Sequence, residues 1–354
     1  MAYKITEDCL SCGACEADCP NQAIREGSDR YVINPTKCTE CMGAWVDPKC
    51  AQVCGVAAPK PDPEHHESKK ELLSKWKKLN PDKPPKGFIL EADLKKPVIA
   101  IIADGGSSDP VGLKQMEDID TLVRKRFPGY DVYWGMQAAY AIRNLQTRGQ
   151  NFYFERGIPM WSAKELLERL AKEGITKVAM ELLMVHESSF SANALNAPRF
   201  NMDVKVGMPF LSTPENRVGL VKALESRFGD GKEVATVLVG HGVLQNFTLN
   251  DVFIEMDKYL RDNYKNVYCG TLHGPPGTEQ LVPAVKNSGC KRVRFISLMI
   301  STSDHIAVDV MGSGPESWKS QIGLPADMVD DFATNPLVLD FFVRSIGKLV
   351  GEFS

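Results

Sequence analysis

The spacing of the cysteines constrains the fold of this chain more than any other feature. Eight of the ten cysteines lie within the first 54 residues. The first run has the pattern C-x2-C-x2-C-x3-C and precedes Pro20, and the second is more widely spaced. The runs are Cys9, Cys12, Cys15 and Cys19, then Cys38, Cys41, Cys50 and Cys54. This pattern is typical of bacterial segments that hold two iron–sulfur clusters, and it predicts two 4Fe-4S clusters as cofactors.

In such segments the fourth cysteine of each run ligates the cluster of the other run. Cluster one would then take Cys9, Cys12, Cys15 and Cys54, and cluster two would take Cys38, Cys41, Cys50 and Cys19. The alternative is a pair of zinc sites, which usually draw C-x2-C pairs from separated segments. Iron–sulfur clusters carry single electrons, so we expect an electron donor or acceptor protein as a partner.

The N-terminal segment resembles the long-insert subgroup of ferredoxins with two 4Fe-4S clusters. The resemblance rests on the eight residues MGAWVDPK that separate Cys41 from Cys50. One departure is Gly55, which follows Cys54 where a proline is usual. The resemblance implies a small ferredoxin-like α+β domain over residues 1–79.

Length and charge limit the function of the rest of the chain. With 354 residues it exceeds the usual size of one hydrophobic core, so more than one domain is expected. The net charge of −3 offers no basic excess for nucleic acid. Its apolar runs are far shorter than the roughly 20 residues of a membrane span, and the N-terminus lacks a signal-peptide pattern. We expect a cytoplasmic protein without a nucleic-acid partner or a membrane span.

A second domain is predicted after a linker at residues 80–97, which is rich in proline and lysine. From residue 98, short apolar runs such as VIAIIAD and KVAMELLMV alternate with amphipathic stretches such as AKELLERLAKEG, and the alternation begins again with VATVLVGHG. This pattern predicts an α/β domain with parallel sheets in two lobes, residues 98–230 and 231–354. Asn335 is the predicted N-cap of a last helix that packs on the sheet.

Three of the six histidines recur at an interval of 32 residues, at His241, His273 and His305. The interval is about one βα unit, and each histidine follows an apolar run. Ligands of open parallel sheets bind outside the carboxyl ends of the strands, so the three imidazoles should converge. They are candidate metal ligands and proton acceptors. We expect the glycines of VGHG and LHGPPG to let a flat ligand approach the backbone.

From about Lys96 onward the chain resembles the anaerobic-type sirohydrochlorin cobaltochelatases of the class II chelatase superfamily. The resemblance rests on RKRFPGYDVYWGMQAAYAIRNL, KVGMPFL, VLVGHG, GTLHGPPG and SDHIAVDVMGSGPESWKSQIG. It implies a two-lobed chelatase-type α/β fold with a tetrapyrrole in the cleft. His241 and His305 match the family's two metal-site histidines, whereas His273 stands where a glutamate is common.

Other positions depart from that family. Asp104 and Gly106 replace its usual phenylalanine and threonine, and Ser188 and Ser189 stand where paired glutamates are often found. His186 and Glu187 could substitute for the lost acids, or His186 could be structural. An all-imidazole site carries less negative charge, so it would release a dication more easily.

The leading hypothesis is a redox-coupled chelatase that inserts divalent cobalt or iron into sirohydrochlorin or a related tetrapyrrole. His241, His273 and His305 would be its catalytic and metal-binding residues, and the clusters would supply electrons. One alternative is a ferredoxin-coupled enzyme that reduces or demetallates a bound haem or siroheme. Another is a non-catalytic module for electron transfer or metal delivery. A homodimer is also expected.

Overall fold

The computed structural model describes residues 2–45, 48–67, 69–83, 96–104, 110–147, 161–244, 246–300, 305–329 and 332–353. They form two compact units, one built mainly from the N-terminal segment and one from most of the residues from Pro97 onward. The predicted linker falls largely on residues 84–95, which lie outside the described residues. Within the described ranges, we find no helix with the length and apolarity that crossing a membrane requires.

The N-terminal unit is a small α+β fold, as predicted. Strand β1 (Tyr3–Ile5) pairs antiparallel with β4 (Pro59–Pro61), and β2 (Ile24–Glu26) pairs antiparallel with β3 (Tyr31–Ile33). The helices are α1 (Ala14–Ala17), α2 (Lys49–Val53) and α3 (Lys69–Leu79). The core consists of Ile5, Cys15, Ile24, Tyr31, Cys50 and Ala58. Two of these six residues are cysteines of the predicted cluster sets. Such a small core is typical of units that need bound metal for stability.

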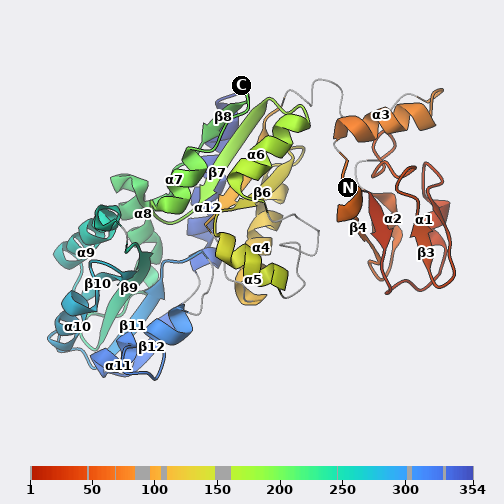
Figure 1. The fold of residues 1–354 in the computed structure, drawn as a ribbon. Coiled ribbons are helices and arrows are strands. Elements are labelled where there is room, and N and C mark those ends of the chain that lie inside the picture. The colour runs from red at the N-terminus through yellow and green to blue at the C-terminus, as the bar shows by residue number, and fades with distance from the viewer. Residues whose placement is uncertain are drawn as a thin grey trace. The chain divides into compact units, whose positions relative to one another are not determined.

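The second unit contains two four-stranded parallel sheets (Figure 1). The first has the order β6-β5-β7-β8, with β5 (Val98–Ala103), β6 (Val132–Met136), β7 (Lys177–Leu183) and β8 (Asp203–Val206). The second has the order β10-β9-β11-β12, with β9 (Val234–Gly242), β10 (Val267–His273), β11 (Arg292–Ser297) and β12 (Ala326–Val329). Strands pair in the same order in both sheets. The predicted fold class, two α/β halves with parallel sheets, is confirmed.

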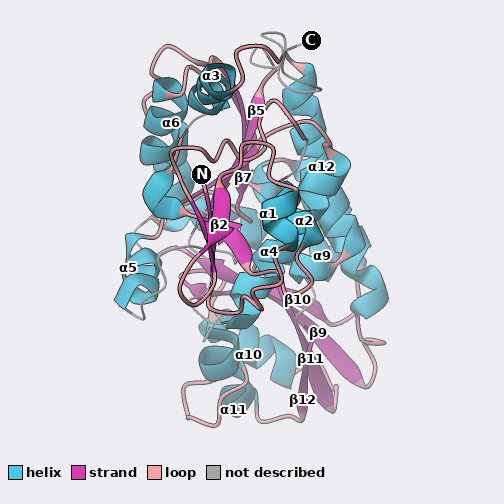
Figure 2. Ribbon diagram, turned by 90° about the vertical axis from the view of Figure 1, so that its right-hand side faces the viewer, coloured by secondary structure: helices cyan, strands magenta, loops and turns pink. Residues whose placement is uncertain are grey.

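Helices cover the sheets because every residue of a strand such as β5 is buried, so both faces need apolar partners. The helices of the first half are α4 (Pro110–Arg126), α5 (Ala139–Thr147), α6 (Ala163–Lys172), α7 (Ser189–Leu195) and α8 (Pro214–Leu224). Those that follow are α9 (Asp251–Asn263), α10 (Thr278–Lys286), α11 (Trp318–Ile322) and α12 (Pro336–Gly351). Figure 2 shows α9 on one side of the second sheet and α10 on the other. This is what two right-handed crossovers require when they run in opposite directions across the sheet, from β9 to β10 and from β10 to β11.

The C-terminal helix packs on the first sheet. Helix α12 follows the second sheet in the chain, yet it packs on β7 of the first sheet. The Ser345 hydroxyl of α12 donates a hydrogen bond to Oε2 of Glu181 in β7 at 2.7 Å. The predicted N-cap is confirmed, because Asn335 Oδ1 accepts a hydrogen bond from the N–H group of Leu337 at 3.0 Å. The end of the chain therefore ties the two halves together.

Candidate metal centres

The first cysteine set surrounds one cavity in the N-terminal unit. Cys9, Cys12, Cys15 and Cys54 line a space of about 140 Å³. Cys15 lies in α1, and Cys54 is the C-cap of α2. The cavity therefore gathers three cysteines of the first run and the last cysteine of the second run.

The second set lines a smaller cavity of about 20 Å³, which contains Cys19, Cys38, Cys41 and Cys50. Its members are three cysteines of the second run and the last one of the first run. This is the same crossed grouping that the spacing predicts. That each set ligates a cluster stays a prediction.

The crossed grouping of the cysteines around two cavities fits a pair of iron–sulfur clusters. Backbone N–H groups also point at four of the sulfurs, from Ser11 to Cys9 at 3.4 Å, Ala23 to Cys19 at 3.2 Å, Lys49 to Cys41 at 3.3 Å and Ala58 to Cys54 at 3.3 Å. Such N–H···S bonds tune cluster potentials.

Burial keeps Cys41 and Cys50 of the second set protonated until metal binds. Desolvation raises the pKa of Cys41 to about 11 and the pKa of Cys50 to about 12. A thiol must lose its proton to ligate iron, so loading these positions would release protons.

The three recurring histidines lie at the carboxyl ends of neighbouring strands in the second unit. His241 is the second-to-last residue of β9, and His273 is the last residue of β10. His305 follows β11 and is the N-cap of a π-helical turn at Ile306–Val310. Because β9 lies between β10 and β11 in the sheet, the three strand ends are adjacent.

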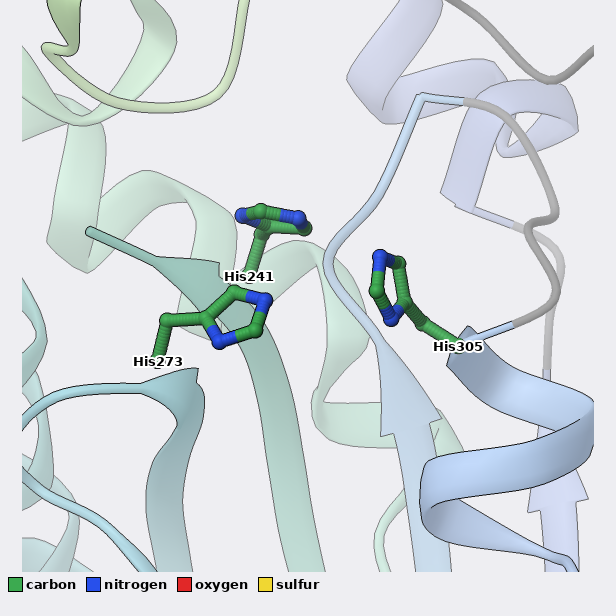
Figure 3. A group of neighbouring side chains, drawn as sticks. All are labelled: His241, His273 and His305. Carbon is green, nitrogen blue, oxygen red and sulfur yellow. The ribbon is translucent and has the colours of Figure 1, made fainter. Parts of the chain in front are cut away.

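The imidazoles face one another across a common space (Figure 3). The ring centroid of His241 lies 4.8 Å from that of His273 and 5.1 Å from that of His305, and the His273 and His305 centroids are 5.6 Å apart. One nitrogen from each ring lies within 4.8 Å of the others, and no other His, Cys, Asp or Glu group of this kind occurs among the described residues. The structure thus brings together three of the nitrogen ligands that divalent cobalt, iron and zinc accept.

Hydrogen bonds orient two of the three rings. The Nδ1–H group of His241 donates to the carbonyl oxygen of Gly242 at 2.9 Å. The Nδ1–H group of His305 donates to Oδ2 of Asp309 at 2.6 Å. Each bond uses the Nδ1 atom and leaves Nε2 as the metal-binding nitrogen. Asp309 is not among the sequence-predicted site residues, although its spacing four residues after His305 places it on the same face of a helical turn.

The site favours the neutral form of the His273 imidazole. Burial lowers the pKa of His273, the neighbouring His241 and His305 act in the same direction, and Asp309 opposes them. Metal binding requires neutral imidazole, so the low pKa of His273 keeps its nitrogen available.

The glycines beside the histidines have a structural role. A Cβ atom on Gly242 would lie 2.1 Å from the carbonyl oxygen of His273, and one on Gly274 would lie 2.5 Å from Nδ2 of Asn250. Both glycines also have positive φ angles, +73° and +80°. They are needed because protein atoms occupy this space. The expectation that they also let a flat ligand approach the backbone stays a prediction.

Residues at the departures from the family pattern have structural partners. Ser188 is the N-cap of α7, where its hydroxyl accepts from the N–H groups of Phe190 and Ser191. The ring of His186 packs edge-on against Phe253, with centroids 4.9 Å apart. Burial lowers the pKa of His186 to about 4, with a further contribution from His241. His186 is therefore a neutral neighbour of the site, whereas Gly106 lies outside the described residues.

Three parts of this molecule now define its class. It has two parallel α/β halves, three imidazoles at adjoining strand ends, and a separate cysteine-rich α+β unit. Together they describe a metal-handling α/β protein with an iron–sulfur module. The chain belongs to the cobalt chelatase (CbiK) family, whose model matches residues 99–328. A model of the 4Fe-4S binding domain matches residues 2–25, so the N-terminal unit is a ferredoxin domain.

Relatives and solved structures match parts of the chain. Ferredoxin Fdx2 of Sorangium cellulosum is 48% identical over 82 residues, which cover 23% of this chain and 81% of that protein. Ferredoxin YfhL of Escherichia coli is 43% identical over 77 residues, which cover 22% of this chain and 90% of that protein. The structure of SirB from Bacillus subtilis with Fe3+ has 12% identity and a TM-score of 0.49, covering 72% of this chain and 96% of that chain.

Proposed function

We propose that this protein is a tetrapyrrole chelatase, a lyase that inserts divalent cobalt or iron into sirohydrochlorin or a related tetrapyrrole. The observation that carries the proposal is the histidine trio, with three ring nitrogens within 4.8 Å of one another. His241, His273 and His305 would be both the ligands of the incoming ion and the catalytic residues. Membership of the cobalt chelatase family supports this assignment.

Insertion exchanges two pyrrole N–H protons of the macrocycle for one M²⁺ ion, so the site must hold the ion and accept protons. Neutral imidazole can do both, because its free nitrogen is either a metal ligand or a base. As the ring nitrogens of the macrocycle capture the ion, each imidazole that it leaves becomes available for a proton. The hydrogen bond from His305 to Asp309 would stabilise the imidazolium that forms.

Exposed apolar side chains beside the trio suit a flat ligand. Leu244 and Phe247, which follow His241 in the chain, are 57% and 54% exposed, and Val308, three residues after His305, is 63% exposed. Apolar groups exposed next to a polar cluster often mark a ligand site.

We also propose that the ferredoxin domain holds two 4Fe-4S clusters in the crossed cysteine sets. When bound, these clusters supply single electrons. The electrons would keep the substrate metal divalent, or reduce the tetrapyrrole or its metal after insertion. A separate donor or acceptor protein would exchange electrons with this domain.

An anaerobic metallation assay tests the proposal. Purified protein is mixed with sirohydrochlorin and Co(II) or Fe(II), and the absorbance change of the macrocycle is followed. We expect turnover, and we expect His241→Ala to lower the rate by roughly 100-fold or more, since it removes a ligand and a proton acceptor. His65→Ala, in the ferredoxin domain, is the matched control and should keep the wild-type rate.

Two results would contradict chelation. One is an absence of metallated product with any divalent ion tested. The other is an equal rate for wild type and His241→Ala. A haem-like Soret band in the purified protein, lost during incubation, would instead favour the reduction or removal of metal from a finished metallotetrapyrrole.

A further inference from the structure

We propose that Asn250 is a positioning residue that holds His241 and His273 at the spacing one metal ion requires. The inference rests on the proposed function of the trio. It assigns a role to a residue outside the predicted site. The side chain of this residue bonds to backbone groups beside the histidines and not to their imidazoles.

Asn250 links the segments that carry the two histidines. Its side chain is fully buried. Oδ1 accepts a hydrogen bond from the N–H group of Val243 at 2.9 Å, and Nδ2 donates to the carbonyl oxygen of Val243 at 3.3 Å. The same Nδ2 atom donates to the carbonyl oxygen of His273 at 2.8 Å. One amide therefore joins the chain just after His241 to the backbone of His273.

Asn250 does not use its side chain to cap its own helix. It is the last residue of a 3-10 turn, Phe247–Asn250, that leads into α9, and Asn246 caps that turn because its Oδ1 atom accepts from the N–H group of Thr248. The hydrogen bonds of the Asn250 amide go instead to the two histidine segments.

The surroundings leave the amide little freedom to move. Gly274 passes so close that a Cβ atom there would lie 2.5 Å from Nδ2 of Asn250. The hydroxyl of Thr271 donates to the carbonyl oxygen of Gly274 at 2.7 Å, which fixes the turn after His273. The ladder between β9 and β10 pairs His273 with Gly242. The amide of Asn250 adds a side-chain link between the same two strand ends.

Loss of this amide would remove a hydrogen-bond partner from three backbone groups, the N–H and carbonyl groups of Val243 and the carbonyl group of His273, and the two segments would move to find new partners. Residues that orient metal ligands typically contribute 10–100-fold to metal affinity. Asn250→Ala should weaken Co(II) binding by about that factor without removing any ligand.

The experiment measures Co(II) binding to the full-length protein under anaerobic conditions, with the clusters oxidised and no tetrapyrrole present. Titration calorimetry gives the affinity, and electron paramagnetic resonance of high-spin Co(II) reports the ligand geometry. We expect Asn250→Ala to bind about 10–100-fold more weakly and to show an altered Co(II) signal. His241→Ala should lose binding more completely, because it removes a ligand.

Asn266→Gly is the matched control. Asn266 also joins two carbonyl groups, those of Gly231 and Ser288 at 3.0 and 3.2 Å, but it precedes β10 at the opposite end from His273. Glycine suits its positive φ of 55°. The control should lose thermal stability yet keep the wild-type affinity and signal.

Wild-type affinity and signal in Asn250→Ala would overturn the inference, and so would an equal loss of affinity in Asn266→Gly. Wild-type Co(II) binding in His241→Ala would show that the metal site itself is elsewhere.

If Asn250→Ala does not fold, Asn250→Asp replaces it, since aspartate keeps the acceptor for Val243 and loses the donor to His273. Its added negative charge would by itself tighten cation binding, so weaker binding supports positioning and tighter binding overturns it.

Discussion

At the scale of single residues, Glu181 is a buried carboxyl group that the proposed reaction does not use. It lies in β7 with 1% of its surface exposed. The hydroxyl of Ser345 donates to its Oε2 atom, and its Oε1 atom is buried with no hydrogen-bond partner. Burial raises the pKa of Glu181 to about 8. The folded chain therefore holds a proton here that the unfolded chain releases at much lower pH.

Glu181→Gln should remove a pH dependence of stability. The folded pKa of about 8 exceeds the ordinary value of 4.5, so the stability of the wild type should fall as pH rises through that window, by up to about 1.4 kcal/mol per pH unit. The loss of unfolding free energy caused by the raised pKa of Glu181 should be constant above pH 8. It should vanish below pH 4.5, the ordinary pKa of a glutamate. Urea unfolding followed by circular dichroism from pH 5 to 8.5 measures this effect.

The exposed acid Glu233 provides the control for that series. Glu233→Gln makes the same chemical change at a side chain with 59% exposure, so its unfolding free energy should track the wild type at each pH. Parallel curves for wild type and Glu181→Gln would show that Glu181 ionises normally in the folded protein.

At the scale of elements, α12 shows how one helix can serve a sheet far from it in sequence. Val338, Phe342 and Ile346 form its buried face. The ring of Phe342 lies 5.7 Å from that of Phe210, which belongs to the first half of the domain. The helix covers the first sheet because an uncovered face of a parallel sheet would expose its apolar side chains.

Truncation of the buried face of α12 should therefore destabilise the first half of the domain. We expect Phe342→Ala to lower the free energy of unfolding by about 3–5 kcal/mol, the usual effect of a phenylalanine-to-alanine cavity. Leu337→Ala is the control on the same helix. Leu337 is 59% exposed, so the change should stay within about 0.5 kcal/mol. Chemical denaturation of both variants gives the comparison, and equal effects would show that α12 does not pack as described.

At the scale of the whole molecule, one chain joins a ferredoxin domain to a member of the cobalt chelatase family. Covalent linkage raises the effective concentration of one domain around the other to the millimolar range for short flexible linkers. Such a link speeds electron transfer when the ferredoxin domain reduces a substrate that the second domain binds. This argument supports redox coupling as part of the proposed function.

Redox coupling predicts that the reduced protein can use oxidised iron. Protein reduced with dithionite and then freed of excess reductant should metallate sirohydrochlorin from Fe(III), because one stored electron converts each Fe(III) to Fe(II). The yield should not exceed the electrons stored per chain. Oxidised protein should give no product from Fe(III), whereas both forms should insert Fe(II) at the same rate. Absorbance of the macrocycle measures the product.

Reduced His241→Ala is the control for that assay. It keeps all eight cysteines of the proposed clusters but lacks one imidazole of the proposed insertion site, so it should reduce Fe(III) without forming metallated product. Equal yields from Fe(III) with reduced and oxidised wild-type protein would contradict the coupling.

Some structural features could not be predicted because their signals are weak in the sequence. The long buried strands such as β5 and β9 stand out as continuous apolar runs. Strands β8 and β12 have four residues each and lie at the sheet edges, and such short, partly exposed strands lack that signal. Trp318 is buried in the core of the second half, and an isolated tryptophan in a sequence does not show whether it packs in a core or against a ligand.

The sequence by itself determined the candidate site residues, because cysteine spacing and a regular histidine interval are local properties of the chain. It also determined the parallel α/β class through the alternation of short apolar and longer amphipathic segments. Only the tertiary structure decided that three imidazole nitrogens lie within 4.8 Å of one another, that Asn250 joins two of their segments, and that α12 covers the first sheet. These features depend on packing between segments far apart in the chain, and packing distances follow from the whole core rather than from any local pattern.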